Sequence, residues 1–441
     1  MKQSKHNIYY SPKEVRTILE RSIDTALDGL KCYCNDPVSD FTRCRKLPAR
    51  SLIECIMSFS NYSSIGELSH FFVGQGEMPS ASALSQRRQL LDPDIFKRIN
   101  NLFVSAFDDH TTINGYHILA QDGSDVNIPF MDDKTKTEKH DAKSFCQYHV
   151  NALYDCLNKV FYDWRIDAAS KKREVNALIS ILKDRNYPQN SIFTADRGYE
   201  SYNLMAHFIE NDIKFVIRVK DIHTKSGLMT NIKTEEGAFD IRVTRTLTSL
   251  QTKEIKADKE KYIFVPSTSN FDFLDETRDL YDLSFRAVRF KISEDTYETV
   301  VTNLSEEEFK TEDFKELYHY RWNEETAFNK LKYTIGLVYF HARKRKLIQQ
   351  EINAAFLMYN VSEVIIRNIY LKKNKKPELE YDYKPNFSSA VTNIRLYLRK
   401  KINMRELILR IKKFLVAQRP ERSYERNIKG QSCKPLNYRT S

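Results

Sequence analysis

The stretch from residue 311 to residue 336 constrains this chain most, because it sets four chemically distinct side chains on one face of an expected helix. Thr311 is a suitable N-cap and Gly336 a suitable end, so the pattern predicts one continuous helix between them. At about 100° per residue, four side chains fall within an arc of about 60°: Tyr318, Arg321, Glu325 and Lys332. A carboxylate among cations suits a site that holds a divalent ion and also binds a polyanion. The same face could also be an exposed one with i,i+4 ion pairs.

Two further acidic positions follow short apolar runs. Asp122 lies in the block Gln-Asp-Gly-Ser, directly after the apolar residues 116–120. Asp196 lies in the block Thr-Ala-Asp-Arg-Gly-Tyr, directly after the strand-like residues 191–193. We therefore expect each carboxylate at the end of a strand, where a rigid sheet edge can fix a ligand. Taken singly, either residue could be an ordinary surface acid.

The spacing Tyr-x2-Arg-x3-Glu-x6-Lys and the two Asp blocks together resemble the DDE transposases of the insertion-sequence-four family. The resemblance extends over residues 115–340. It implies an α/β fold: a ribonuclease-H-like mixed sheet with helices on both faces, a β-rich insertion, and helical N- and C-terminal regions. It also implies that Asp122, Asp196 and Glu325 are the catalytic residues and the metal ligands, with Asp122 bridging two ions.

Cleavage of a phosphodiester must stabilise charge on both the attacking and the leaving oxygen, which two divalent ions can do together. Such ions prefer carboxylate oxygens, so we expect two Mg²⁺ ions per site, with Mn²⁺ as a substitute. The nearest rivals are Asp125, which should point to the other side of its strand, and Glu324, which should lie off the shared helix face.

The other residues of the shared helix face are expected to bind DNA. Arg321 and Lys332 could hold phosphate oxygens, and Tyr318 could donate to a phosphate or stack on a base. Trp322, on a flanking face, is expected in the core. Some relatives stack a displaced base on a Trp of the β insertion, but residues 220–300 contain no Trp.

These features predict a transposase of a bacterial insertion sequence. It would bind terminal inverted repeats in double-stranded DNA, hydrolyse the element's end and use the freed 3′-hydroxyl to attack target DNA, as a dimer on DNA. The alternatives are a transposase-derived DNA-binding regulator or architectural protein that no longer cuts, and a nuclease without strand transfer. Neither a membrane nor a small-molecule substrate is expected.

The bulk properties agree with a nucleic-acid partner without requiring one. The net charge is +11 and the pI about 9.0. The seven cysteines show no CxxC pair, which favours a reducing cytoplasm over secretion, and a zinc cluster of Cys32, Cys34 and Cys44 is disfavoured. The resemblance to transposases implies a place near the bacterial nucleoid. The most apolar window, residues 354–366, is interrupted by polar side chains and too short to span a bilayer.

The chain divides into five expected regions. Residues 1–110 read as helices and a DNA-binding domain, in which a helix over residues 80–91 carries Arg87 and Arg88 outward to DNA. Residues 111–220 and 284–345 form the two parts of the catalytic domain, separated by a β-rich insertion at 221–283. Residues 346–441 form a basic helical region, whose charged face is either solvated, in contact with DNA, or bound to a partner helix.

Overall fold

The computed structural model describes residues 1–5, 9–43, 45–74, 76–129, 136–137, 145–168, 173–224, 226–266, 268–269, 271–294, 296–371 and 382–418. The α-helices are α1 (Pro12–Asp28), α2 (Ala49–Met57), α3 (Ser64–Phe72), α4 (Ala81–Leu90), α5 (Asp94–Val104), α6 (Glu174–Asp184), α7 (Tyr202–Glu210), α8 (Lys253–Ala257), α9 (Asp313–His319), α10 (Trp322–Lys330), α11 (Arg345–Leu371), α12 (Phe387–Leu398) and α13 (Met404–Lys413). Shorter turns are η1 (Leu30–Tyr33), η4 (Arg197–Tyr199) and η5 (Leu331–Ile335). The strands are β1 (Gln3–Lys5), β2 (Thr111–Ile113), β3 (His117–Ile128), β4 (Lys136–Thr137), β5 (Phe145–Asp155), β6 (Val160–Ala168), β7 (Ser191–Ala195), β8 (Lys214–Val219), β9 (Phe239–Thr248), β10 (Tyr262–Phe264), β11 (Leu280–Ser293), β12 (Thr296–Thr302), β13 (Asp382–Pro385) and β14 (Leu415–Gln418).

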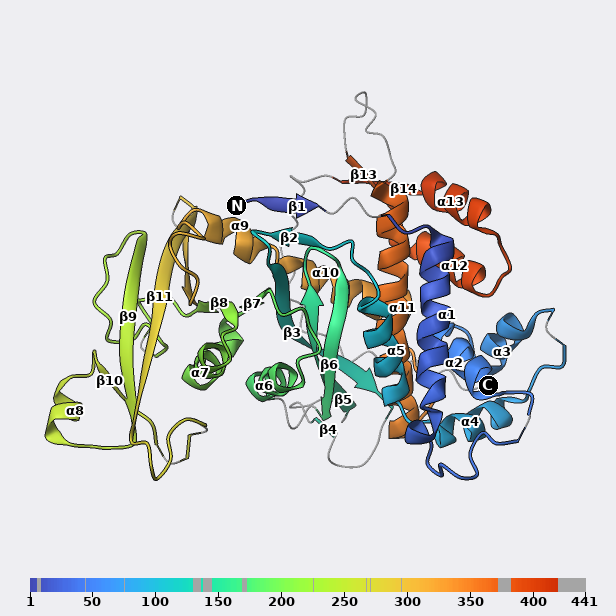
Figure 1. Ribbon diagram of the computed structural model, residues 1–441, viewed down its shortest axis with the longest axis horizontal. Helices are drawn as coiled ribbons and strands as arrows, with labels where there is room; N and C mark the ends of the chain where they lie inside the picture. The colour runs from blue at the N-terminus through green and yellow to red at the C-terminus, as the bar shows by residue number, and fades with distance from the viewer. Residues whose placement is uncertain are drawn as a thin grey trace.

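A ten-stranded mixed sheet runs through the protein in the order β10-β9-β11-β12-β8-β7-β3-β5-β4, with β6 also paired to β5. β3, β7 and β8 are mutually parallel, whereas β3, β5 and β6 are joined as antiparallel hairpins. Helices α6 and α7 lie in front of the strands in Figure 1, and α10 passes behind them. The predicted α/β class is therefore confirmed at the level of a large mixed sheet covered by helices.

The region expected to be a β-rich insertion extends this same sheet. β9 pairs with β11, which pairs in turn with β12, so the strands at the left of Figure 1 continue the central sheet. Arg286 of β11 fixes this extension, because it donates to both carboxylate oxygens of Asp240 at 2.7 and 2.5 Å and to the carbonyl of Phe309 at 2.8 Å. β11 also crosses the boundary that we placed at residue 283.

Helix α1 shows how local sequence sets an element. Ser11 caps its N terminus by accepting from the Glu14 N–H, while the Glu14 carboxylate accepts from the Ser11 N–H at 2.6 Å. Pro12 occupies the first turn, where its missing N–H costs nothing. Val15 and Leu19 follow at helical spacing, and both are buried.

Helices from both ends of the chain form one bundle around α11 (Figure 1). Arg88 of α4 donates to Glu351 Oε1 at 2.6 Å and to the Leu347 carbonyl at 2.7 Å, both in α11. Glu351 also lies 3.1 Å from His341 Nδ1. Burial alone would lower the pKa of His341, but the carboxylates of Glu351 and Glu67 raise it to about 9. A network of two acids and two cations thus lies between the N-terminal helices and α11.

Three remaining expectations concern the apolar window, the cysteines and the basic C-terminal region. The apolar residues 354–366 lie inside α11, and no helix among the described residues is both long and apolar enough to cross a membrane. Cys32 and Cys34 are free thiols, but Cys44 lies outside the described residues, as does the tail from residue 419 onward. In the basic C-terminal region, α12 and α13 pack together, and Leu407 and Ile411 of α13 are buried.

Candidate active site

Asp122 lies in the middle of β3 and not at a strand end. Our expectation of a strand end was wrong because β3 continues to Ile128 through residues whose pairing partners lie on β5, 18 to 28 residues later in the chain. The strand is held on both sides, by β5 and by β7, which gives Asp122 a rigid base. Its Oδ1 accepts a 2.8 Å hydrogen bond from the Gly123 N–H.

The carboxyl group of Asp122 is crowded by other acids. Burial raises its pKa to about 6, and the carboxylates of Glu325 and Glu174 act in the same direction. Arg321 and the Gly123 N–H oppose this rise without cancelling it. A buried carboxyl group with a raised pKa, facing further acids, is typical of a functional site.

Asp196 follows directly after β7, as predicted. β7 is parallel to β3, and Ala195 pairs with Gln121. Asp196 and Asp122 each come directly after this pair, so they lie at the same level on adjacent strands. Asp196 caps the short turn η4 by accepting from the Arg197 N–H at 2.7 Å. Its Oδ1 also accepts from the Tyr318 hydroxyl at 3.4 Å, and Arg218 Nε lies 3.6 Å away.

The segment expected to be one helix is divided into three parts. Tyr320 and Arg321 separate α9 from α10, because the N–H groups of Arg321, Asn323 and Glu324 donate three residues back instead of four. The final turn, η5, is a π-helix that ends at Gly336 with φ of 114°. The Thr311 cap is wrong: the Thr311 hydroxyl donates to Asp240 at 2.5 Å, and no side chain caps α9.

The predicted face of this segment nevertheless points toward the part of the sheet that carries Asp122 and Asp196. Its four residues are Tyr318, Arg321, Glu325 and Lys332. Arg321 Nε donates to the Tyr318 hydroxyl at 3.1 Å, and its NH2 group donates to Glu325 Oε1 at 3.2 Å. Lys332 Nζ donates to the Asp125 carbonyl of β3 at 2.8 Å. Burial lowers the pKa of Lys332, although the nearby carboxylates favour its charged form.

Arg321 is the point on which the three candidate carboxylates converge. The residue is buried, which alone would lower its pKa, but four acidic neighbours raise the pKa overall. They are, in order of effect, Tyr318, Asp196, Asp122 and Glu325. Its side chain is thus engaged by the protein itself, and as it lies here it is not presented to an external phosphate.

Of the two adjacent glutamates, Glu325 is the accessible one. Its side chain is 32% exposed and is joined to Arg321. Glu324 is fully buried, and burial together with the Asp122 carboxylate raises its pKa well above the ordinary value. This arrangement agrees with the choice of Glu325 from the spacing of the sequence.

His149 and Glu174 are neighbours of the site that the sequence did not indicate. His149 Nδ1 lies 2.6 Å from Asp125 Oδ1, and its Nε2 lies 3.2 Å from Glu174 Oε1. His149 also approaches Gly123 so closely that a Cβ there would lie 2.3 Å from the imidazole. Packing against His149 therefore requires a glycine at this position of the Gln-Asp-Gly-Ser block. The sequence shows the glycine but not the reason for it.

The donor set suits a hard divalent cation in its chemistry. Asp122, Asp196 and Glu325 offer carboxylate oxygens, and the pKa of Asp122 is raised mainly by burial, with a smaller contribution from Glu325 and Glu174. Within the described residues, however, no group of three or more His, Cys, Asp or Glu side chains lies close enough to hold an ion as the side chains stand. Arg321 instead provides the positive charge among them.

The expectation that Arg88 faces outward to DNA is wrong. Its side chain is 2% exposed and is held by Glu351 and Leu347 in the helical bundle. Arg87 is partly buried, donates to the Leu47 carbonyl at 3.1 Å and lies over the Phe41 ring at 4.1 Å. Both guanidinium groups therefore stabilise the N-terminal helices.

Trp322 also differs from its expected place in the core. It is 43% exposed, and the Arg321 guanidinium lies 5.2 Å from the centre of its ring. Because Arg321 occupies the inner position at the break between α9 and α10, the next residue is turned outward. Trp322 and Tyr318 line a hollow of about 500 Å³ together with Phe290 and Glu298.

A family model described as "Transposase DDE domain" matches residues 113–361, a range that contains Asp122, Asp196 and Glu325. Among solved structures, the cryo-EM structure of the piggyBac transposase synaptic complex with hairpin DNA is similar with a TM-score of 0.45 and 11% sequence identity. That match covers 96% of this chain and 90% of the other. No curated protein matches the chain.

Proposed function

The chain belongs to the transposase DDE domain family, and on that premise we propose that it cuts DNA at the ends of a mobile element and joins the freed 3′-hydroxyl to target DNA. The observation that carries this proposal is geometric: Asp122 lies on β3, and Asp196 follows the adjacent parallel strand β7. Arg321 donates to Glu325 and to the Tyr318 hydroxyl, which in turn donates to Asp196. The Tyr-x2-Arg-x3-Glu-x6-Lys spacing supports the narrower proposal of a bacterial insertion sequence of the insertion-sequence-four type. Its DNA would then be terminal inverted repeats and target duplex, bound by a dimer near the nucleoid.

The proposed architecture is a ribonuclease-H-like catalytic core. The order β6-β5-β3-β7-β8 supports it, with a hairpin unit followed by parallel strands that alternate with α6 and α7. The core would comprise residues 111–220 and 284–345, interrupted by the insertion at 221–283. The helical regions 1–110 and 346–441 would contribute to DNA binding.

Asp122, Asp196 and Glu325 would hold two Mg²⁺ ions, or Mn²⁺ in their place, with Asp122 shared between them. Such ions stabilise the charge that develops on the attacking and leaving oxygens of a phosphodiester. The Tyr318 hydroxyl, hydrogen-bonded to Asp196, and Arg321, hydrogen-bonded to Glu325, orient two of these carboxylates. The rigid pairing of β3 with β5 and β7 fixes the third.

Three outcomes of one assay separate this function from its rivals. The protein would be incubated with labelled duplex that carries the repeat flanking its own gene, and with unlabelled target DNA. Cleavage followed by joining to the target is expected. Cleavage without joining would indicate a nuclease, and binding without cleavage in either Mg²⁺ or Mn²⁺ would indicate a non-catalytic DNA-binding descendant.

Trp322→Ala is expected to weaken binding of the element's end. An exposed indole next to Arg321 offers a surface on which a base can stack. Loss of one such contact costs about 1–3 kcal/mol, at least about a fivefold rise in Kd. The measurement is fluorescence anisotropy of a labelled end duplex. Leu280→Ala is the control, since Leu280 is an apolar side chain that is 48% exposed and lies in the insertion, outside the regions proposed to bind DNA. Equal affinity of Trp322→Ala and wild type would remove Trp322 from the DNA interface.

A further inference from the structure

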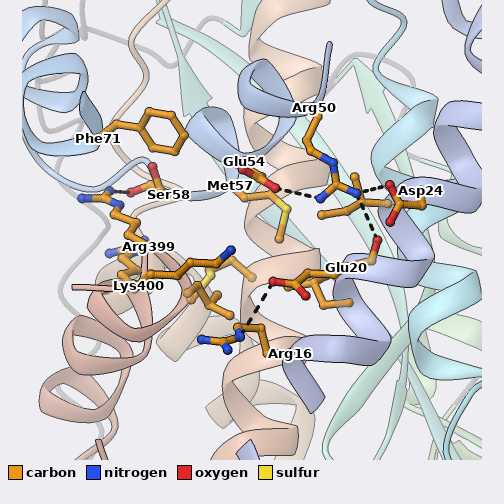
Figure 2. Close-up of a pocket in the computed structure, with 15 residues that line it drawn as sticks. Arg16, Glu20, Asp24, Arg50, Glu54, Met57, Ser58, Phe71, Arg399 and Lys400 are labelled. Carbon is orange, nitrogen blue, oxygen red and sulfur yellow. Dashed lines mark hydrogen bonds and ion pairs between the residues drawn. The ribbon is translucent and has the colours of Figure 1, made fainter. Parts of the chain in front are cut away.

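A cavity of about 420 Å³ lies in the helical bundle, separate from the candidate active site (Figure 2). Its walls come from α1, α2, α3, α11 and α12. The volume lies in the range of pockets that enclose small organic molecules. Neither the transposase function nor the three carboxylates account for it.

One wall of the cavity is cationic and poorly compensated. Arg395, Arg399 and Lys400 line it from the end of α12 and the two residues that follow. The Nε groups of Arg395 and Arg399 are buried and have no hydrogen-bond partner among the described residues. Their other donors reach only carbonyl groups, such as that of Ser58 at 2.9 Å from Arg399. Two partly buried guanidinium groups thus lie side by side on this wall, and neither is bonded to a carboxylate among the described residues.

The pKa values reflect this strain. Burial lowers the pKa of Arg395 to about 10, and the nearby charge of Arg399 acts in the same direction. Burial also lowers the pKa of Arg399. Glu67 acts on both in the opposite direction, but its carboxylate is already bonded to the N–H groups of Ser60 and Tyr62. An anion entering the cavity would relieve an existing electrostatic cost.

The opposite wall is charged but internally paired. Arg50 is ion-paired with Asp24 and Glu54, and Arg16 lies 3.8 Å from Glu20 (Figure 2). The opposite charges within these pairs largely cancel, so this wall contributes little net charge. The cavity as a whole is lined by five cationic and three acidic side chains, so the excess positive charge belongs to the α12 wall.

The floor between the two walls is apolar. It is formed by Leu19, Ile23, Met57, Phe71 and Met358. A bare ion would leave this surface uncovered, whereas a molecule with an apolar or aromatic body would cover it. The ligand chemistry is therefore an anionic group joined to an apolar body.

We propose that this cavity is a binding site for a small organic phosphate of about mononucleotide size, with its phosphate on Arg399 and Lys400 and its body on the apolar floor. Guanidinium and ammonium groups together match the geometry and charge of a phosphate dianion. The site lies outside the candidate active site and needs no metal.

The test is isothermal titration calorimetry with four probes: phenyl phosphate, adenosine monophosphate, inorganic phosphate and adenosine. One saturable site is expected for the first two, weaker binding for inorganic phosphate and none for adenosine. Lys400→Gln is expected to weaken phenyl phosphate binding about tenfold, since a hydrogen bond to a charged group is lost. Lys400 is exposed, so this variant should fold. Lys412→Gln, which removes an equally exposed charge outside the cavity, is expected to bind as wild type does.

Arg399→Gln provides a second variant, chosen over Arg395 because Arg395 also holds the carbonyls of Phe59 and Ile335. The proposal is overturned if neither phenyl phosphate nor adenosine monophosphate binds saturably to wild type. It is also overturned if binding is the same in Lys400→Gln, Arg399→Gln and Lys412→Gln. Binding of a single-stranded oligonucleotide that depends on these residues, without binding of either small probe, would assign the cavity to DNA and would likewise contradict it.

Discussion

Asp196→Asn is expected to lower the rate of DNA end cleavage by about 10³-fold or more while the fold stays intact. The substitution removes the negative charge that a divalent ion requires, but an amide oxygen can still accept from the Arg197 N–H and cap η4. The fold should therefore lose little. The measurement is single-turnover cleavage of a labelled end duplex, with circular dichroism melting as the check on folding.

Asp212→Asn is the matched control for this substitution. Asp212 lies between α7 and β8. Its side chain is 95% exposed and forms a 3.6 Å ion pair with Lys214. The Asp212→Asn variant should cleave at the wild-type rate. Cleavage by Asp196→Asn within about tenfold of wild type would exclude Asp196 from the catalytic site.

Glu351→Ala is expected to destabilise the protein by about 3–5 kcal/mol, because it leaves buried Arg88 and His341 without their shared carboxylate. The effect should appear as a lower urea midpoint and a lower Tm. The double variant Arg88→Met with Glu351→Met removes one charge of each sign and should recover part of the loss.

Glu406→Ala serves as the surface comparison for Glu351. Glu406 and Arg410 form an i,i+4 pair in which both side chains are 41% exposed, so its loss should change stability little. If Glu351→Ala and Glu406→Ala melted alike, the buried network would not hold the N-terminal helices to α11.

The sequence predicted best what depends on neighbouring residues. The position of Asp196 directly after β7 was predicted from a local pattern, an apolar run followed by the block Thr-Ala-Asp-Arg-Gly-Tyr. The choice of Glu325 over Glu324 rested on helix geometry, and the structure turns Glu324 into the interior. These features need no knowledge of the rest of the chain.

Features that depend on distant partners could not be predicted. Arg88 looks like a surface cation in sequence, and its partner Glu351 is 263 residues away. β3 continues past Asp122 through polar residues because β5 supplies its pairing. The break that turns Trp322 outward arises from the burial of Arg321 among acids on other elements. His149 and Glu174, which lie beside the site, carried no local pattern at all.

The most direct test of the account is metal-dependent cleavage of the element's own end by wild type, Glu325→Gln and Glu324→Gln, with binding followed in parallel. We predict that wild type cuts at the element boundary in Mg²⁺ or Mn²⁺ but not in EDTA. Glu325→Gln should bind without cutting. Burial raises the pKa of Glu324 well above its ordinary value, so this carboxyl group already favours its neutral form. Glu324→Gln should therefore retain cleavage. Cutting in EDTA, or cutting by Glu325→Gln at the wild-type rate, would contradict the assignment of a metal-dependent site to Asp122, Asp196 and Glu325.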